Sequence, residues 1–427
     1  MHLKQLNGKK ICILGFGREG QATFRALRLY APDAQVTVAD QQNVTLPEGV
    51  TDVCLQAGSD WLKDLDRFDV VIKSPGIPPC PELAALGTKL TNATQIFLDT
   101  VAEDGATVIG VTGSKGKSTT STLIHLMLDA AGHDAFLIGN IGKPSLDYVE
   151  ESSRNTVFVM EMSSYQLMDI VRSPHIAVIT SFFPEHLDYH GSVDAYMEAK
   201  KHITKFQNTD DVVFFNGQSE GAKEIAHASD GNKIPFTPND APVTLEETRL
   251  IGTHNLGNIA AASKVTEYLG VPKDIRIAVL KDFPGLPHRL QKLGTFQSIE
   301  WVDDAISTTP ESAIAALEAL KGRVVTIILG GQDRGNDFRT LAETITASPI
   351  KNIILFPGSG ARIRKAMEET QAAVTFFDAD SMEAAVRIAK EVTPQGTICL
   401  LSTASPSYGM FKNFEDKGDQ FRRCIGL

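Results

Sequence analysis

Short apolar segments rich in Val and Ile recur along the chain and alternate with segments of helical spacing. Parallel strands are covered by helices on both faces, so their side chains are buried on both sides and appear as continuous apolar runs. The alternation therefore predicts an α/β fold built from βαβ units with mostly parallel sheets. The predicted strands are 9–14, 34–40, 69–74, 107–113, 156–162, 175–181, 211–216, 324–331, 351–356 and 396–402, and the predicted helices include 310–320, 359–370 and 381–392.

The length of 427 residues argues against a single hydrophobic core, because domains typically hold about 100–200 residues. The alternation of strands and helices breaks at 87–106 and again at 282–295, where Pro284, Gly285 and Pro287 interrupt a helical stretch. We therefore predict three domains, which cover residues 1–94, 95–286 and 287–427.

The charge pattern excludes several classes of partner. The chain has 41 Lys and Arg against 52 Asp and Glu, a net charge of -11, and no basic block, which argues against a nucleic-acid or anionic membrane partner. No apolar run reaches the roughly 18 residues that a bilayer requires, and the first residues lack the pattern of a signal peptide. The five cysteines are scattered, so neither a disulfide framework nor a zinc site is expected. We expect a cytoplasmic protein that acts on small molecules.

The clearest functional signal is GVTGSKGKSTT at 110–120, which follows a predicted strand and opens a helix. In such a loop, glycines let backbone N–H groups approach phosphate oxygens and the helix N-terminus attracts the anion. Lys117 would reach the outer phosphates, and the Ser118 hydroxyl would bind Mg²⁺. The strict P-loop spacing would place its first glycine at Val111, so this is a variant loop, and the alternative is a turn without ligand. The predicted phosphate-binding residues are Gly113, Ser114, Lys115, Gly116, Lys117, Ser118 and Thr119.

A second glycine pattern lies near the N-terminus. Gly15, Gly17 and Gly20 follow the first predicted strand, and Asp40 ends the next one, as in dinucleotide-binding folds. Alone, the pattern would indicate an NAD-dependent oxidoreductase, and a tight turn without ligand is the other alternative. Because the chain also has a stronger phosphate loop, this site is expected to hold a different nucleotide or a sugar nucleotide.

Three polar residues follow the phosphate loop at predicted strand ends or on the next helix: Glu161, His186 and Lys200. Open α/β sheets bind ligands at the carboxyl ends of their strands. A single residue of this kind is usually structural, but their joint placement after a phosphate loop favours a role at the bound phosphates.

Five segments together resemble the Mur ligase family. They are GVTGSKGKSTT, MEMSSYQL, HLDYHGSVDAYMEAKKHI, GTHNLGN at 252–258 and LPHRLQ at 286–291. The resemblance implies a Rossmann-like UDP-binding domain, a central P-loop ATPase domain and a C-terminal Rossmann-like domain that closes over the site. It also implies a monomer that adds D-glutamate to UDP-N-acetylmuramoyl-L-alanine with ATP, through an acyl phosphate, in peptidoglycan synthesis.

The resemblance assigns roles to individual residues. Lys117, Glu161, His186 and Lys200 would be catalytic, and two Mg²⁺ ions would be held by Ser118 with Glu161 and by His186 with an N-carbamylated Lys200. Further implied contacts are Asn258, Arg289 and Asp304 with ATP, Arg18, Glu19, Asp40, Gly76 and Asn140 with the UDP substrate, and Thr308, Arg334, Ser407 and Phe414 with glutamate.

The chain departs from the family pattern where glutamate is expected to bind. After the strand at 299–303, relatives commonly show Asn-Asp-Ser-Lys-Ala-Thr-Asn, whereas Ile306 replaces the lysine here. Arg334 stands where some relatives have lysine, and Gly409 stands in place of an aspartate-containing pattern. These changes leave open whether the enzyme prefers D- or L-glutamate. Another Mur-type ligase, a folylpolyglutamate-type ligase and a non-catalytic nucleotide-gated module are further alternatives, although a pure binder would not need both metal positions.

Overall fold

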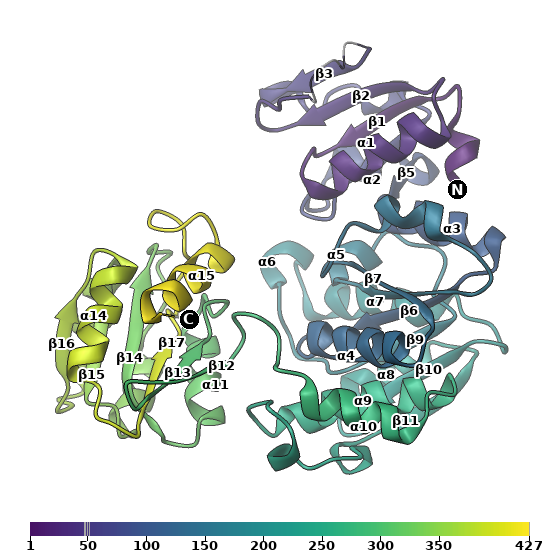
Figure 1. Ribbon diagram of the computed structural model, residues 1–427. Coiled ribbons are helices and arrows are strands. Elements are labelled where there is room, and N and C mark those ends of the chain that lie inside the picture. The colour runs from purple at the N-terminus through teal and green to yellow at the C-terminus, as the bar shows by residue number, and fades with distance from the viewer. Residues whose placement is uncertain (47, 49, 51, 427) are drawn as a thin grey trace. The chain divides into compact units, whose positions relative to one another are not determined.

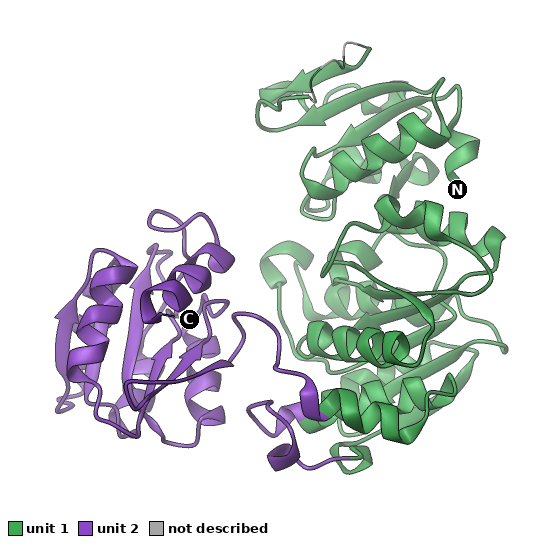
Figure 2. Cartoon of the chain, viewed as in Figure 1, with its two compact units in different colours: residues 1–242, 256–280 green, residues 243–255, 281–427 purple. Residues whose placement is uncertain are grey.

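The computed structural model describes residues 1–46, 48, 50 and 52–426 and shows an α/β fold with three sheets (Figure 1). The chain forms two compact units, one of residues 1–242 and 256–280 and the other of residues 243–255 and 281–427 (Figure 2). The predicted α/β class is confirmed, and each predicted strand coincides with a strand of the structure.

The first sheet has five parallel strands in the order β3-β2-β1-β4-β5. The central strand β1 is buried from Ile11 to Leu14, as expected for a strand covered on both faces. The turn after β1 and the end of β2 lie at the carboxyl edge of this sheet, which is where open α/β sheets bind ligands. The elements are β1 Lys10–Leu14, α1 Arg18–Tyr30, β2 Gln35–Asp40, β3 Cys54–Ala57, β4 Val70–Lys73, α2 Pro81–Ala84 and β5 Leu90–Asn92.

The second sheet has six parallel strands in the order β11-β10-β9-β6-β8-β7. Strand β6, which leads into the phosphate loop, lies between β8 and β9, so residues after these three strands meet at one edge. The strands are β6 Thr107–Thr112, β7 Asp134–Gly139, β8 Thr156–Glu161, β9 Ile176–Ile179, β10 Val212–Asn216 and β11 Asn232–Phe236. The helices are α3 Ala93–Asp104, α4 Lys117–Ala130, α5 Ser164–Leu167, α6 Leu187–His190, α7 Val193–Lys205, α8 Glu220–His227, α9 His254–Tyr268 and α10 Lys273–Asp282.

Helix α3 connects the first two sheets and contributes to a core that both share. Asn92 begins the helix, since its side chain accepts a hydrogen bond from Gln95 N at 2.8 Å, the usual N-cap arrangement. Phe97 on α3 is fully buried and its ring centroid lies 5.1 Å from that of Phe158 on β8. One apolar cluster therefore runs from the first sheet through α3 into the second.

The third sheet belongs to the second unit and has the order β12-β13-β17-β14-β15-β16. Only the β12–β13 pair is antiparallel, and the other described pairs are parallel. The elements are β12 Gln291–Phe296, β13 Ile299–Asp303, α11 Pro310–Ala319, β14 Val324–Gly331, α12 Arg339–Thr346, β15 Asn352–Gly358, α13 Gly360–Glu369, β16 Thr375–Asp378, α14 Met382–Val392, β17 Ile398–Leu401 and α15 Phe414–Ile425.

The predicted boundaries near 94 and 286 fall between sheets, the first inside α3 and the second between α10 and β12. They remain predictions, since the compact units divide the chain differently. Within the described part of the chain, no helix is both long and apolar enough to cross a bilayer.

Candidate active site

The loop between β6 and α4 depends on two glycines. Gly113 and Gly116 have φ angles of 148° and 89°, which residues other than glycine rarely adopt. A Cβ atom on Gly113 would lie 2.0 Å from Thr180 Oγ1, and one on Gly116 would lie 2.3 Å from Asn258 Oδ1. The loop can therefore pack against its neighbours only because both residues lack a side chain.

Residues that follow β9 hold the loop in place. Ser114 N donates to Ser181 O at 2.9 Å and Lys115 N donates to Ser181 Oγ at 2.9 Å. Thr180 Oγ1 donates to Lys115 O at 2.6 Å. The sequence interpretation did not single out Thr180 or Ser181. Their position directly after a strand beside β6 is the signal that could have found them.

Two lysines place positive charge at the N-terminus of α4. Lys117 Nζ donates to Gly113 O at 2.8 Å and to Ser114 O at 3.1 Å. Its ammonium group therefore binds carbonyl groups of the loop that precedes α4. Lys115 pairs with Glu185 at 2.7 Å. These charges add to the partial positive charge of the helix N-terminus. Ser118 and Thr119 form the first turn of α4.

Glu161 ends β8 next to the phosphate loop, opposite Val111 of β6. Its side chain is 1% exposed, and Oε1 accepts a hydrogen bond from Asn140 Nδ2 at 2.7 Å. Among the described residues, Oε2 has no hydrogen-bond partner. A buried carboxylate oxygen without a partner is costly, and it is the type of atom that Mg²⁺ binds, so the Glu161 carboxylate fits the role of a metal ligand.

Lys200 reaches the same loop from α7. It is 1% exposed, and its Nζ donates to Gly113 O at 3.0 Å and to Thr112 Oγ1 at 3.3 Å. Burial, together with the nearby charge of Lys117, holds the pKa of Lys200 well below its ordinary value. A neutral amine is the form that reacts with CO₂, so the environment suits the predicted carbamylation.

His186 lies in the left-handed region at φ 57° and immediately precedes α6. Burial lowers the pKa of its imidazole, while the charges of Lys117 and Lys200 lower it further and that of Glu185 raises it. The structure thus brings His186, Lys117 and Lys200 within electrostatic range. In the described ranges, no cluster of three His, Cys, Asp or Glu side chains forms a metal site by itself.

Aromatic residues around His186 were not anticipated from the sequence. The Tyr165 ring lies between the His186 ring, 5.2 Å away, and the Tyr189 ring, 4.1 Å away, measured between centroids. The Tyr196 hydroxyl lies 3.0 Å from Ser114 Oγ of the phosphate loop. These residues lie within predicted motifs, but their contacts depend on how α5, α6 and α7 pack.

The N-terminal glycine pattern forms a tight turn. Gly15 has φ 86°, and a Cβ on Gly20 would lie 2.1 Å from Gly15 O. Asp40 Oδ2 accepts a hydrogen bond from Phe16 N at 2.8 Å, and its Oδ1 accepts one from Gln42 N at 2.9 Å. Asp40 therefore stabilises this turn through both of its carboxylate oxygens.

Two predicted UDP contacts connect α1 with the loop after β7 and with α5. Arg18 donates to Gly142 O at 2.8 Å, and Glu19 Oε1 accepts a hydrogen bond from Gln166 Nε2 at 2.8 Å. Glu19 Oε2 is buried without a hydrogen-bond partner in the described structure. Burial raises the pKa of Glu19 to about 7. Gly76 is exposed in the loop that follows β4.

The second unit contains a buried polar cluster around Asp304. Its carboxylate accepts hydrogen bonds from Leu290 N at 3.2 Å and Ser402 Oγ at 2.8 Å. Burial raises the pKa of Asp304 to about 6. The Nε atom of Arg289 is buried and finds no hydrogen-bond partner among the residues that the structure describes.

His288 and Lys417 join this cluster and were not predicted as site residues. His288 Nδ1 lies 2.7 Å from Asp303 Oδ2, and this carboxylate raises the pKa of the imidazole. Lys417 is 1% exposed and its Nζ donates to Thr403 Oγ1 at 2.5 Å. Burial lowers the pKa of Lys417 to about 8. The cluster holds the loop before β12 against α15.

The predicted glutamate contacts also lie in the second unit. Phe414 begins α15, and its ring centroid is 6.2 Å from that of His288. The Ser407 hydroxyl is buried without a hydrogen-bond partner in the part of the chain described. Arg334 is exposed and donates to Gln332 Oε1 at 3.4 Å, while Thr308 is half-buried. The structure brings Phe414 close to the Asp304 cluster but does not by itself assemble a glutamate site.

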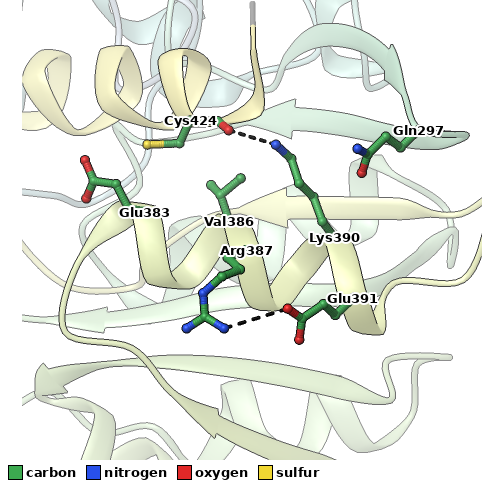
Figure 3. A pocket seen from close by; sticks show the side chains of 7 residues that line it. All are labelled: Gln297, Glu383, Val386, Arg387, Lys390, Glu391 and Cys424. Carbon is green, nitrogen blue, oxygen red and sulfur yellow. Dashed lines mark hydrogen bonds and ion pairs between the residues drawn. The ribbon is translucent and has the colours of Figure 1, made fainter.

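A cavity of about 450 Å³ lies elsewhere on the second unit, lined mainly by α14, with Gln297 and Cys424 beside it (Figure 3). Lys390 Nζ donates to Cys424 O at 2.9 Å, and Arg387 lies 3.7 Å from Glu391. None of its lining residues is a candidate site residue. It therefore adds nothing to the site described above.

Comparison with known proteins agrees with these motifs. Residues 111–238 match the model of the Mur ligase middle domain, and residues 288–404 match that of the Mur ligase, glutamate ligase domain. A UDP-N-acetylmuramoyl-L-alanine--L-glutamate ligase from Salinispora tropica is 36% identical, over 100% of this chain and 99% of the relative. A UDP-N-acetylmuramoylalanine--D-glutamate ligase from Streptococcus uberis is 36% identical, over 98% of this chain and 96% of the relative.

Solved structures share the fold at low identity. The MurF ligase from Thermotoga maritima in complex with ADP is 14% identical with a TM-score of 0.61, covering 99% of this chain and 96% of that one. The UDP-N-acetylmuramate-alanine ligase from the same organism is 16% identical with a TM-score of 0.59, covering 97% of this chain and 98% of that one. With relatives of this identity along its whole length, the chain belongs to the Mur ligase family.

Proposed function

We propose that the protein is an ATP-dependent ligase that joins D-glutamate to UDP-N-acetylmuramoyl-L-alanine in peptidoglycan precursor synthesis. The observation that carries the proposal is the convergence of Lys117 and Lys200 on Gly113 O, beside the buried carboxylate of Glu161. Full-length relatives named as glutamate ligases support the substrate. The ADP complex of a ligase with the same fold supports nucleotide binding. Cytoplasmic location and a monomeric state remain predictions.

The first step of the proposed reaction is phosphoryl transfer. A carboxylate oxygen of the alanyl group attacks the γ-phosphorus of ATP, the bond to ADP breaks and an acyl phosphate forms. Both reactants are anions, so positive charge is needed where they meet. Lys117 supplies this charge, and the backbone N–H groups at the start of α4 supply hydrogen bonds to phosphate oxygens.

In the second step, the amine of glutamate attacks the acyl carbon. Phosphate leaves with the bonding electrons, and the nitrogen loses a proton to give the amide. Thr308, Arg334, Ser407 and Phe414 are the proposed glutamate contacts. Ser407 Oγ has no hydrogen-bond partner among the described residues, which supports a contact with a carboxylate. An arginine at 334 can bind a carboxylate with two parallel hydrogen bonds.

Two Mg²⁺ ions are part of the proposal. Ser118 and Glu161 would hold one, and His186 with carbamylated Lys200 would hold the other. Such ions polarise phosphoryl oxygens and neutralise charge during transfer. The unsatisfied Glu161 Oε2 and the lowered pKa of Lys200 both support these assignments.

The remaining assignments follow the same three-domain proposal, with boundaries near 94 and 286. Asn258 packs against Gly116 of the phosphate loop, which supports a nucleotide contact. The proposed ATP contacts are Asn258, Arg289 and Asp304, and the proposed UDP-substrate contacts are Arg18, Glu19, Asp40, Gly76 and Asn140.

L-Glutamate is the second candidate for the added amino acid. Ile306 and Gly409 replace charged residues of the common family pattern, and the relative from Salinispora tropica is named as an L-glutamate ligase. Loss of charge at these positions would change how a carboxylate is oriented in the site. The nucleotide half of the site would be unaffected.

The test is phosphate release from ATP with Mg²⁺ and UDP-N-acetylmuramoyl-L-alanine, measured with D-glutamate, L-glutamate or no amino acid. We expect release that depends on D-glutamate. Release with L-glutamate alone would select the second candidate. Release with neither would contradict glutamate ligation, and testing other amino acids would then identify another Mur-type activity.

A further inference from the structure

The loop after β4 is anchored by a tyrosine from the short helix α6. The Tyr189 hydroxyl lies 2.7 Å from Pro75 O and 2.7 Å from Ile77 O, on either side of the exposed Gly76. One hydroxyl hydrogen is thus shared between two backbone carbonyl groups. The contact ties an exposed loop of the first sheet to the short helix α6.

A buried ion pair supports the same loop. Lys73 is 2% exposed, and its Nζ lies 2.7 Å from Asp169 Oδ2. The ammonium also donates to Ile77 O at 3.3 Å. Tyr189 of α6 and the Lys73–Asp169 ion pair therefore both hold this loop.

Tyr189 is also connected to the proposed metal ligand His186, because the Tyr165 ring contacts both side chains. Tyr189 lies three positions after His186. The Tyr165 ring lies 4.1 Å from the Tyr189 ring and 5.2 Å from the His186 ring. A movement of Tyr189 would therefore be transmitted to the His186 side chain by direct packing, since close-packed side chains cannot shift independently.

The chain of contacts continues to the phosphate loop. The His190 ring lies 5.0 Å from the Tyr189 ring and 5.3 Å from the Tyr196 ring. The Tyr196 hydroxyl is 3.0 Å from Ser114 Oγ, and Lys200 Nζ lies 4.9 Å above the Tyr196 ring. An uninterrupted series of side chains thus connects the loop around Gly76 with the loop that contains Ser114.

We propose that Tyr189 is a positioning residue that fixes the Gly76 loop relative to the phosphate loop and His186. The inference rests on the proposed function, which places the UDP substrate on this loop and ATP on the other. Phosphoryl transfer requires the reacting atoms to approach within about 3–3.5 Å, and a displacement of about 1 Å can cost roughly a hundredfold in rate. A rigid connection between the two loops meets this requirement.

The test separates the two ends of the series. Tyr189→Phe removes only the hydroxyl, so we expect the dissociation constant of UDP-N-acetylmuramoyl-L-alanine, measured by calorimetry without ATP, to rise about fivefold to tenfold. KM for the same substrate should rise similarly, with KM for ATP nearly unchanged. Tyr165→Leu removes the ring between Tyr189 and His186. This variant should lower kcat about tenfold or more while the UDP substrate still binds nearly as in the unmodified protein.

Tyr268→Phe is the matched control. It also removes a tyrosine hydroxyl, but from a side chain that is 53% exposed on α9. It should leave binding and turnover unchanged, and thermal unfolding should show that all three variants are folded. If Tyr189→Phe binds the UDP substrate normally, or if Tyr165→Leu weakens that binding as much as turnover, the inference is wrong although ligation stands. If the unmodified protein releases no phosphate with either glutamate, the proposed function itself is wrong.

Discussion

At the scale of single residues, Lys200 is the most specific test of the chemistry. Its buried amine donates a hydrogen bond to Gly113 O, and burial lowers the pKa of this amine. If Lys200 works as a carbamate, Lys200→Ala should reduce turnover about a thousandfold or more. Removal of groups that stabilise charge in a transition state has effects of this order. Formate or acetate should restore part of this turnover, measured as phosphate release.

Lys201→Ala is the matched control, since that lysine pairs with Glu198 and Glu224 on the helix surface. It should retain turnover. A Lys200→Ala variant with near-normal activity would contradict any catalytic role. Inactivity without rescue by carboxylic acids would contradict carbamylation and leave a role for the amine.

Glu19 predicts a pH-dependent stability. Burial raises its pKa to about 7, so between about pH 4 and pH 7 the folded state holds a proton that the unfolded state has released. Stability is therefore lost as pH rises through this range. Glu19→Gln keeps the acceptor for Gln166 but cannot ionise, so it should be more stable than the unmodified protein at pH 8 by on the order of 2 kcal/mol. Urea unfolding at pH 5 and pH 8 measures this, and a difference independent of pH would contradict it.

At the scale of elements, the phosphate loop predicts a contrast between two glycines. Gly116 and Gly270 have similar φ angles of 89° and 83°, but only at Gly116 would a Cβ meet another atom, Asn258 Oδ1 at 2.3 Å. Alanine at either position should cost about 1–2 kcal/mol of stability. Only Gly116→Ala should also abolish ADP binding, measured by calorimetry. Equal ADP affinity in the two variants would show that the loop tolerates a side chain.

The sequence predicted central strands better than edge strands. Strand β8 is buried along its whole length, so it appears as an apolar run. The first-sheet edge strand β3 is partly exposed, and the edge strand β11 contains Pro235. Edge strands need neither two apolar faces nor every backbone N–H group, so hydropathy alone does not reveal them. Strand β12 forms an antiparallel edge and was missed for the same reason.

The site shows the same division. Lys117 and Glu161 could be predicted as site residues because a strand followed by a loop, or by a polar residue, is a local pattern. His288 and Tyr189 were missed because their roles arise from contacts outside any local sequence pattern. Tyr189, for example, binds Pro75 O across 114 positions. No periodicity or motif spacing encodes such a contact.

At the scale of the whole molecule, the distribution of apolar cores predicts how the chain unfolds. One cluster contains Ile13 of the first sheet, Phe97 of α3 and Phe158 of the second sheet. The third sheet has separate clusters on its two faces, around Leu329 and around Trp301. Because a shared core makes unfolding cooperative, the first two sheets should unfold together and the third sheet separately. Calorimetry should therefore show two transitions, and three would contradict the shared core.

Ligand binding should identify these transitions. The phosphate loop and Asn258 belong to the first unit. ADP with Mg²⁺ should therefore raise chiefly the midpoint temperature at which the first two sheets unfold. At a hundred times the dissociation constant, the stabilisation should be about 2.7 kcal/mol. Lys117→Ala should show the same two transitions without this shift, because it removes a proposed phosphate contact and not a core residue. An equal shift of both transitions would mean that the third sheet also binds the nucleotide strongly before any reaction, through residues such as Arg289.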